Sequence, residues 1–452
     1  MLPDVALLEI FQFYVDEEEW YTLVHVCRKW RNVVFGSPRR LNLRLSCIAS
    51  TPTREMLDIW PHNLPITVWD ERDEVIDDAL DMDNIFAALE HNDRICNLDL
   101  AYFGTPSPGL KKVLAALQRP FPELTSLELW CGESTPVQPD SFLGGSAPRL
   151  RSLFLSSIPF PGLPKLLLSA THLVNLGLQR IPHSGYISPE AMVTSLSVLT
   201  RLEVLKIEFE SLGSRLAQKS RYLPPQTRTL LPVLTGLRFV GVDQYLEDFV
   251  ARIDAPLLKK LDISFNHRHS FDTLQITQFI SRSLKFKTYN EARVVFSDGF
   301  ASGVVRVTLP QESGGGIELA IYCEAVWQLS SLVQLCSSFR QGPISVVENL
   351  YITEDRVFPP DWPDDNESNQ WQELFHAFTA VKGLYISREF VTEVASALVG
   401  ERVTEVFPAL RTLFLEETLS TGPLQEIIEF VAARQVAGHP ISVSNWERKP
   451  YE

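Results

Sequence analysis

A few residues of this 452-residue chain have the side chains that catalysis or metal binding requires. His267 and His269 could ligate a metal, but the sequence places no third ligand beside them, so a polar loop after a strand is expected. Gly144-Gly145 and the triple glycine at 314–316 lack the lysine and the Ser or Thr of a phosphate-binding loop. The sequence therefore predicts no catalytic residue, no metal site and no cofactor.

The cysteines also fail to form a reactive or metal-binding set. They stand at positions 27, 47, 96, 131, 323 and 336, without a CxxC pair or zinc-ligand spacing. Reduced thiols in a cytoplasmic or nuclear protein fit this pattern best. Cys27 falls within an apolar helical stripe, where a buried and inert thiol is expected.

Charge and hydropathy limit the classes of partner. The chain has 41 basic and 56 acidic residues, a net charge of −15, and this excess of acid disfavours binding to a phosphate backbone. No apolar run reaches the length of a membrane span, and no secretory signal is visible. We therefore expect neither a nucleic-acid nor a membrane partner. The acidic segments 70–81 and 361–367 are expected to be solvated loops, with capture of a basic target as the alternative.

The first 47 residues predict three short amphipathic helices. Pro3 suits the first turn of a helix, and Leu7, Ile10 and Phe11 recur at three- and four-residue spacing. A second apolar stripe follows Trp20, and Ser37-Pro38 ends the third helix. A module this small buries little surface, so a partner or a neighbouring domain should complete it.

A Leu-x-x-Leu-x-Leu pattern begins near residue 95 and organises the rest of the chain. Its first anchors stand at 95, 124, 150, 173, 202, 234 and 258, and again at 347, 381 and 410. Successive anchors lie between 23 (173 − 150) and 34 (381 − 347) residues apart, which is typical of an irregular leucine-rich repeat with a strand and a returning helix. The leucines of each Leu-x-Leu should point into a core made by stacking, and the residue between them should point outward.

The pattern fails between about residues 283 and 340. Residues 293–296 and 304–309 alternate as strands, and the glycines at 314–316 read as a turn. This segment is either a hairpin-like insertion or two decayed repeats. Residues 441–443 could form a final strand.

The N-terminal motif resembles a known family. Leu2-Pro3, Ile10-Phe11 and Val26-Cys27-x-x-Trp30 are similar to the F-box, a helical module that docks on the Skp adaptor of cullin–RING ubiquitin ligases. With the repeats behind it, the chain resembles the F-box proteins with degenerate leucine-rich repeats that are expanded in mushroom-forming (basidiomycete) fungi. The resemblance implies an α/β fold with an F-box over 1–47, a linker or first irregular repeats over 48–94, and a repeat solenoid of inner parallel strands and outer helices over 95–452.

The same resemblance implies two binding surfaces. The Skp adaptor, and through it a cullin, would be bound by residues of the three helices, of which Phe11 and Leu23 could equally be core: Leu2, Pro3, Leu8, Ile10, Phe11, Leu23, Val26 and Trp30. A protein target would be bound by the outward residues of the strands: Asp99, Glu128, Trp130, Phe154, Lys206, Glu208, Arg238, Asp262, Tyr351, Tyr385, Phe414 and Glu416. Exposed aromatic residues and arginine are enriched at interfaces, although neighbouring loops could instead cover these rings.

The expected function is that of a substrate-recognition subunit of a Skp–cullin–F-box ubiquitin ligase, without catalysis of its own. One alternative is a leucine-rich protein-binding scaffold that has lost ligase coupling. Another is an enzyme whose site the sequence does not reveal, which a pocket with convergent acids or bases would support.

Overall fold

The computed structural model describes residues 2–14, 20–69, 82–102, 108–132, 135–210, 227–266, 273–286, 289–298, 303–311, 314–339, 342–355, 368–399, 404–416 and 424–448. His267, His269 and the acidic segments 70–81 and 361–367 lie outside these residues. The chain divides into two compact units, Met1–Glu210 and Ser211–Glu452. In the described part of both units, no helix is long and apolar enough to cross a membrane.

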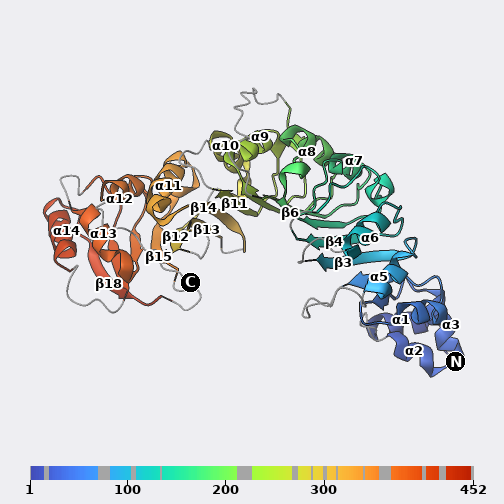
Figure 1. Cartoon of the computed structure of the whole chain (residues 1–452). Helices are drawn as coiled ribbons and strands as arrows, with labels where there is room; N and C mark the ends of the chain where they lie inside the picture. Colours follow the sequence, from blue (N-terminus) through green and yellow to red (C-terminus); the bar gives the residue numbers. More distant parts are fainter. Residues whose placement is uncertain are drawn as a thin grey trace. The chain divides into compact units, whose positions relative to one another are not determined.

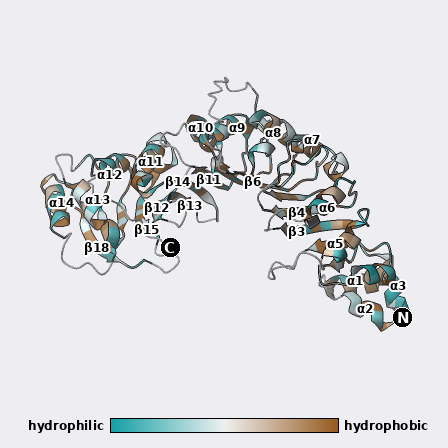
Figure 2. Ribbon diagram, viewed as in Figure 1, coloured by the Kyte–Doolittle hydropathy of each residue, from teal (hydrophilic) through white to brown (hydrophobic). Residues whose placement is uncertain are grey.

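The first unit begins with three helices, α1 (Asp4–Tyr14), α2 (Trp20–Val26) and α3 (Arg28–Gly36). In Figure 2 they carry both hydrophobic (brown) and hydrophilic (teal) residues, as amphipathic helices do. Their shared core also takes in Leu41, Leu43 and Leu64, with Trp60 packed against it. The helices thus complete their core with residues that follow them in the chain, as their small size requires.

Trp20 lies at the centre of this core. Its ring centroid is 5.2 Å from that of Trp60 and 6.1 Å from that of Phe35, both edge-on, and its indole N–H donates to the Arg44 carbonyl oxygen at 3.0 Å. This one side chain therefore joins α2 to α3 and to the segments around β1 (Leu45–Cys47) and α4 (Thr53–Ile59).

Cys27 differs from the sequence-based expectation. It is exposed, with extended backbone (φ −161°, ψ 167°), between the end of α2 and the start of α3. The chain must leave helical geometry for one residue to turn from α2 into α3, so the side chain leaves the apolar stripe. The prediction that Cys27 is buried on a helix face is wrong.

A parallel sheet follows in the first unit, with its strands in chain order and helices on one side (Figure 1). Its strands are β1, β2 (Ile66–Trp69), β3 (Ile95–Tyr102), β4 (Ser126–Cys131), β5 (Ser152–Ser156), β6 (Asn175–Ile181) and β7 (Val204–Phe209). The helices after α4 are α5 (Met82–Leu89), α6 (Pro108–Ala116), α7 (Leu163–Leu167) and α8 (Pro189–Leu196), with 3-10 turns η1 (Phe142–Gly145) and η2 (His183–Gly185). In each unit, the face of the sheet without helices is called the open face below.

The second unit continues the same strand–helix alternation. Its strands are β8 (Thr229–Leu230), β9 (Gly236–Gly241), β10 (Ile253–Asp254), β11 (Lys260–Asn266), β12 (Glu291–Asp298), β13 (Gly303–Pro310), β14 (Gly316–Tyr322), β15 (Asn349–Glu354), β16 (Gly383–Ile386), β17 (Thr412–Glu416) and β18 (Ser442–Trp446). Its helices are α9 (Asp243–Val250), α10 (Leu274–Arg282), α11 (Ala325–Ser338), α12 (Ser368–Phe375), α13 (Val391–Leu398) and α14 (Leu424–Val436), with 3-10 turns η4 (Leu284–Phe286), η5 (Pro343–Val346) and η6 (Arg388–Phe390). β8 and β10 form a separate parallel pair.

The irregular segment between 283 and 340 contains antiparallel hairpins. β12 pairs with β13 and β13 with β14, both antiparallel, while β14 lies parallel to β11 and β12 parallel to β15. β13 therefore runs against its neighbours and lets the chain add two further strands without a crossover helix. Gly315 and Gly316 have positive φ, and a Cβ on Gly316 would lie 2.2 Å from the Leu309 carbonyl oxygen, so the tight turn requires glycine.

Leucine pairs fix the packing of the central strands of the first unit. Leu127 and Leu129 of β4 are buried, as are the equivalent leucines of β3 and β5, and the residues between them are not. The prediction that the leucines of each Leu-x-Leu point into the core is confirmed for these strands.

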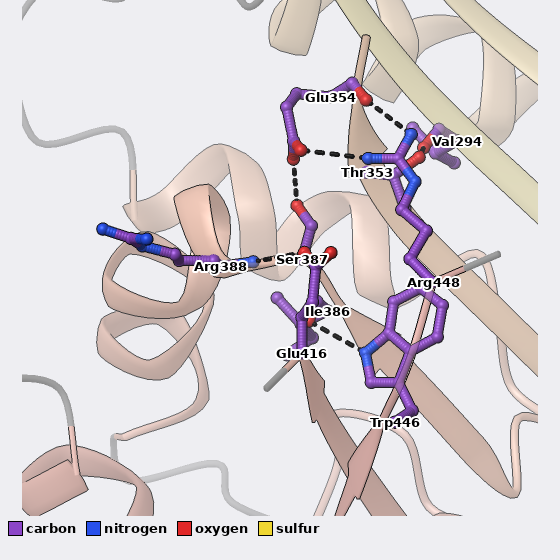
Figure 3. Close-up of polar contacts among 9 residues, drawn as sticks. All are labelled: Val294, Thr353, Glu354, Ile386, Ser387, Arg388, Glu416, Trp446 and Arg448. Atoms are coloured by element: carbon purple, nitrogen blue, oxygen red, sulfur yellow. Dashed lines mark hydrogen bonds and ion pairs between the residues drawn. The ribbon is translucent and has the colours of Figure 1, made fainter. Parts of the chain in front are cut away.

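The C-terminal residues contact the strands and turns of the second unit (Figure 3). β18 pairs in parallel with β17, as expected for a final strand near 441–443. The Trp446 indole N–H then donates to the Ile386 carbonyl oxygen at 3.2 Å. Arg448 forms a buried ion pair with Glu354, at 3.0 Å between Nη1 and Oε1, and also donates to the Glu354 carbonyl oxygen at 2.6 Å.

Replacement of Trp20 by alanine should destabilise the N-terminal helices strongly. It removes a large side chain that is only 5% exposed, together with its hydrogen bond, which costs about 3–5 kcal/mol. The loss in the free energy of unfolding is measured by urea unfolding of the full chain, in the transition in which the N-terminal helices unfold. Tyr21→Ala, next to it but exposed, should change stability by only about 0.5 kcal/mol. Equal losses in the two variants would contradict the assignment of Trp20 to the core.

Replacement of Arg448 by methionine should destabilise the second unit, because it leaves the buried Glu354 carboxylate without its cation. The expected loss is about 3–5 kcal/mol in urea unfolding. Adding Glu354→Gln to this variant should restore a large part of the loss, since the uncompensated charge is then gone. Arg388→Met, at an exposed neighbouring position, serves as the control. A double variant as unstable as Arg448→Met alone would contradict the ion-pair account.

Candidate protein-binding surfaces

The expected adaptor residues divide between the core and the surface of the helices. Leu8, Phe11 and Leu23 are buried in the helical core, and Trp30 is partly buried with its ring 4.9 Å from that of Phe11. In this conformation Phe11 and Leu23, for which both roles were open, are core residues, and so is Leu8. The side chains of Leu8, Phe11, Leu23 and Trp30 hold the helices together.

The other expected adaptor residues face solvent. Leu2 is 52% exposed, Ile10 48% and Val26 58%, and Pro3 is also exposed. Lys29 donates to the Leu2 carbonyl oxygen at 2.6 Å and pairs with Asp4 at 3.2 Å, so the N-terminal residues are tied to the start of α3.

Sequence reasoning missed three further exposed apolar residues of the same helices. Phe13 is 93% exposed, and Val5 and Tyr21 are also exposed. Phe13 follows Ile10 by three residues, so the two share one side of α1. The sequence placed Ile10 on the same apolar stripe as Leu7 and Phe11, yet Ile10 is exposed while the other two are buried. A spacing pattern alone does not show which side of α1 is covered.

The open face of the first unit brings several expected target residues into one row. Asp99, Glu128, Phe154, Gly177 and Lys206 are register partners across β3 to β7, and Glu208 follows Lys206 by two residues. The strand period of two places all of these on the same face.

Two aromatic rings pack together on this face. The centroids of Trp130 and Phe154 are 4.4 Å apart, and the Trp130 indole N–H donates to Glu128 Oε1 at 2.6 Å. A Cβ at position 177 would lie 2.5 Å from the Phe154 ring, so the absence of a side chain at Gly177 leaves room for the ring. The result is a half-buried aromatic patch beside the carboxylates of Asp99 and Glu128.

The open face of the second unit carries a longer row, which begins with charged residues. Arg238 of β9 pairs with Asp262 of β11 at 3.3 Å, and Asp262 is in register with Glu318. Arg306 forms an ion pair with Glu318 at 2.9 Å. Asp262 was predicted to face outward and bind a target, but it is buried and pairs with Arg238 instead.

The row continues through the hairpins into three stacked rings. Thr308 and Arg293 follow Glu318 in register and lead to Tyr351. The rings of Tyr351 and Tyr385 stack at 4.1 Å, and those of Tyr385 and Phe414 at 4.2 Å with an interplanar angle of 2°. The Arg293 guanidinium lies 5.6 Å from the Tyr351 ring centroid. Burial first, and then the nearby Tyr385, raises the pKa of Tyr351 above its ordinary value.

Sequence reasoning missed Arg293, Thr308 and Glu318, because they lie where the leucine pattern fails. It also missed Trp446, whose ring meets those of Tyr351 and Tyr385 edge-on at 5.9 and 5.6 Å. The alternative that neighbouring segments cover the rings therefore holds in part. Glu416 accepts a hydrogen bond from the Arg388 backbone N–H at 3.2 Å, so it supports the turn η6 (Figure 3).

Buried cysteines of the described residues have raised pKa values. Burial raises the pKa of Cys47 and Cys323 to about 11 and that of Cys131 to about 12, which keeps these thiols protonated at neutral pH. Within the described ranges, no three His, Cys, Asp or Glu side chains are grouped as metal ligands.

A comparison with known proteins matches residues 1–41 to the family described as F-box-like. A search of curated proteins gives no match. The matched residues cover α1 to α3 and the first residues after them, including most of the helical core and the exposed apolar side chains described above. The N-terminal helices of this chain thus form an F-box-like domain, and F-box proteins generally serve as substrate adaptors of Skp–cullin–F-box ubiquitin ligases.

Proposed function

We propose that this chain is the substrate-recognition subunit of a Skp–cullin–F-box type ubiquitin ligase. The F-box-like helices bind the Skp adaptor, and through it a cullin, while the open faces bind a protein target. The chain supplies no catalytic residue in this proposal, because holding a target near a conjugating enzyme raises the effective concentration of the reacting groups.

The observation that carries the proposal is the exposed apolar surface of the F-box-like helices. Leu2, Val5, Ile10, Phe13 and Val26 stay exposed although the helices already have a complete core. Several exposed large apolar side chains on one small module make that module a candidate protein-binding surface. Their burial by an adaptor would contribute roughly 25 cal/mol for each Å² removed from water.

The open faces have the composition that a target surface requires. Stacked rings and paired arginines are already restricted in side-chain rotation. They therefore lose little conformational entropy when a partner binds. Trp130 with Phe154, and Tyr351 with Tyr385 and Phe414, are such pre-ordered groups. The flanking ion pairs, Arg238 with Asp262 and Arg306 with Glu318, give each partner a fixed charge pattern to match.

We also propose that the part of the chain after the F-box-like helices is a leucine-rich repeat, because one structural unit recurs along it. Each Leu-x-x-Leu-x-Leu anchor supplies one strand of a mostly parallel sheet, and a helix or turn returns the chain to the next strand. The same surface would serve a scaffold without ligase coupling, and adaptor binding separates the two functions.

Changing Ile10 and Phe13 to glutamate should abolish adaptor binding. Both side chains are exposed in the free chain, so the fold is expected to survive while two apolar contacts are replaced by charges. The affinity for a Skp adaptor should fall roughly 100-fold or more, measured by co-elution in size-exclusion chromatography and by calorimetry.

The matched control carries the same change on exposed apolar residues elsewhere in the first unit, Val137→Glu and Leu168→Glu. It should bind the adaptor like the unchanged chain. A well-folded chain that binds no Skp adaptor would favour the scaffold function, and equal binding by both variants would remove α1 from the interface.

Changing Tyr351 and Tyr385 to alanine should remove target binding and leave adaptor binding intact. The two substitutions break the three-ring stack, whereas Trp327→Ala removes an exposed aromatic ring from the helix side as a control. Quantitative mass spectrometry of purified complexes should show targets lost from the first variant alone, with the adaptor present at equal amounts in all samples. Capture of the same proteins by all three chains would exclude the stack as the target site.

A further inference from the structure

A pocket of about 940 Å³ lies in the first unit, where the loop after α3 meets the beginnings of the strands. Its walls come from residues 36–44, from residues 62–65 before β2, and from the residues that precede or begin β3, β4 and β5. It is separate from the exposed apolar surface of α1 and from the aromatic patch of the open face, and its size is in the range of small-ligand sites.

The pocket concentrates positive charge in an acidic chain. Six arginines line it, against two carboxylates, those of Asp93 and Glu123. The six are Arg39, Arg40, Arg44, Arg94, Arg149 and Arg151. The local balance is therefore 6 − 2 = +4, whereas the whole chain carries −15.

The carboxylates nearby compensate only part of this charge. Arg39 and Arg149 share the single carboxylate of Glu123, at 2.6 and 2.5 Å, and Arg40 pairs with Glu9. Among the described residues, no acid pairs with the other three arginines. Arg44 donates only to the neutral side-chain amide of Asn42, at 3.2 Å.

Arg94 is the most buried of the six. Its residue is 8% exposed, and its guanidinium donates to the carbonyl oxygens of Leu64 and Pro61 at 3.1 and 3.4 Å. Its Nη1 atom is buried and has no hydrogen-bond partner. Burial lowers the pKa of this guanidinium, and the nearby Asp93 opposes that shift. Burial of a cation without a directly paired anion is costly, and an anion bound at the unpartnered Nη1 would offset that cost.

We propose that this pocket binds a compact ligand with at least two phosphoryl groups. The guanidinium fork matches phosphate oxygens in a bidentate manner, and one phosphoryl group carries about −1.5 to −2 charges, so about two are needed to neutralise +4. An extended nucleic acid fits poorly, because the surrounding chain is acidic. The ligand would touch both the loop that ends the F-box-like domain and the first strands, and so would stabilise their junction.

The proposal is tested on the full chain with inorganic tripolyphosphate as the probe. At about 0.15 M ionic strength, calorimetry should show one bound ligand per chain and thermal unfolding should shift upward. Arg44→Gln with Arg151→Gln removes two uncompensated cations that are not buried, so the chain still folds. This variant should bind the probe roughly tenfold or more weakly.

The matched control, Arg119→Gln with Arg201→Gln, removes the same charge from exposed positions outside the pocket and should bind like the unchanged chain. A folded chain that does not bind tripolyphosphate, or an equal loss in both variants, would overturn the proposal. So would equally tight binding of sulfate and citrate, which would show a site for any anion.

A displacement experiment with peptides identifies the source of the phosphoryl groups. If a peptide with two phosphoserines displaces tripolyphosphate while its unphosphorylated form does not, the ligand is supplied by a phosphorylated target. If neither peptide displaces it, the ligand is a free small molecule. Both results retain the phosphoryl-binding pocket, and neither depends on adaptor binding.

Discussion

Burial of paired leucines on the helix-covered face is the constraint from which the rest of the structure follows. Successive strand residues point to opposite faces, so a slip of one residue would expose Leu127 and Leu129 and bury Glu128. Each leucine contributes about 1.5–3 kcal/mol on burial, which makes such a slip prohibitive. The register is therefore fixed by the core, and the rows on the open faces are its consequence.

The same constraint explains why the open faces can vary. A residue between two leucines contributes little to the core, so its side chain is free to be acidic, basic or aromatic. In the first unit these positions combine the Trp130–Phe154 pair with carboxylates, and in the second unit they combine ion pairs with a three-ring stack. The hairpins β12 to β14 keep the second row continuous even though they break the leucine pattern. A surface of this kind can change its ligand without a change of fold.

The F-box-like helices are part of the first unit, and residues that follow them in the chain complete their core. Leu43, Leu64 and Trp60, which lie beyond the matched residues 1–41, pack against the helical core. Trp20 and Arg94 both bond to backbone carbonyls across this junction. Residues up to the first strands therefore hold α1, the proposed adaptor-binding helix, in position. The arginine pocket lies at the same junction.

Much of this architecture can be predicted from the sequence, because leucine spacing and helical periodicity indicate which residues are buried. The three helices, the strand anchors and the outward position of Tyr351 and Tyr385 follow from such patterns. The division of Leu8, Ile10 and Phe13 between core and surface does not, since it depends on how α1 rotates against its neighbours. Contacts between distant segments, such as Trp446 on Tyr351 or six arginines around one pocket, leave no periodic signal at all.

Hydrogen–deuterium exchange of the full chain, with and without a Skp adaptor, tests the central claim most directly. The account predicts slower exchange over residues 2–14 and 20–36 when the adaptor is bound, and unchanged exchange in β15 and β16, which remain free for a target. Protection of β15 and β16 by the adaptor, or no protection of the N-terminal helices in a chain that binds it, would contradict the assignment of the two surfaces.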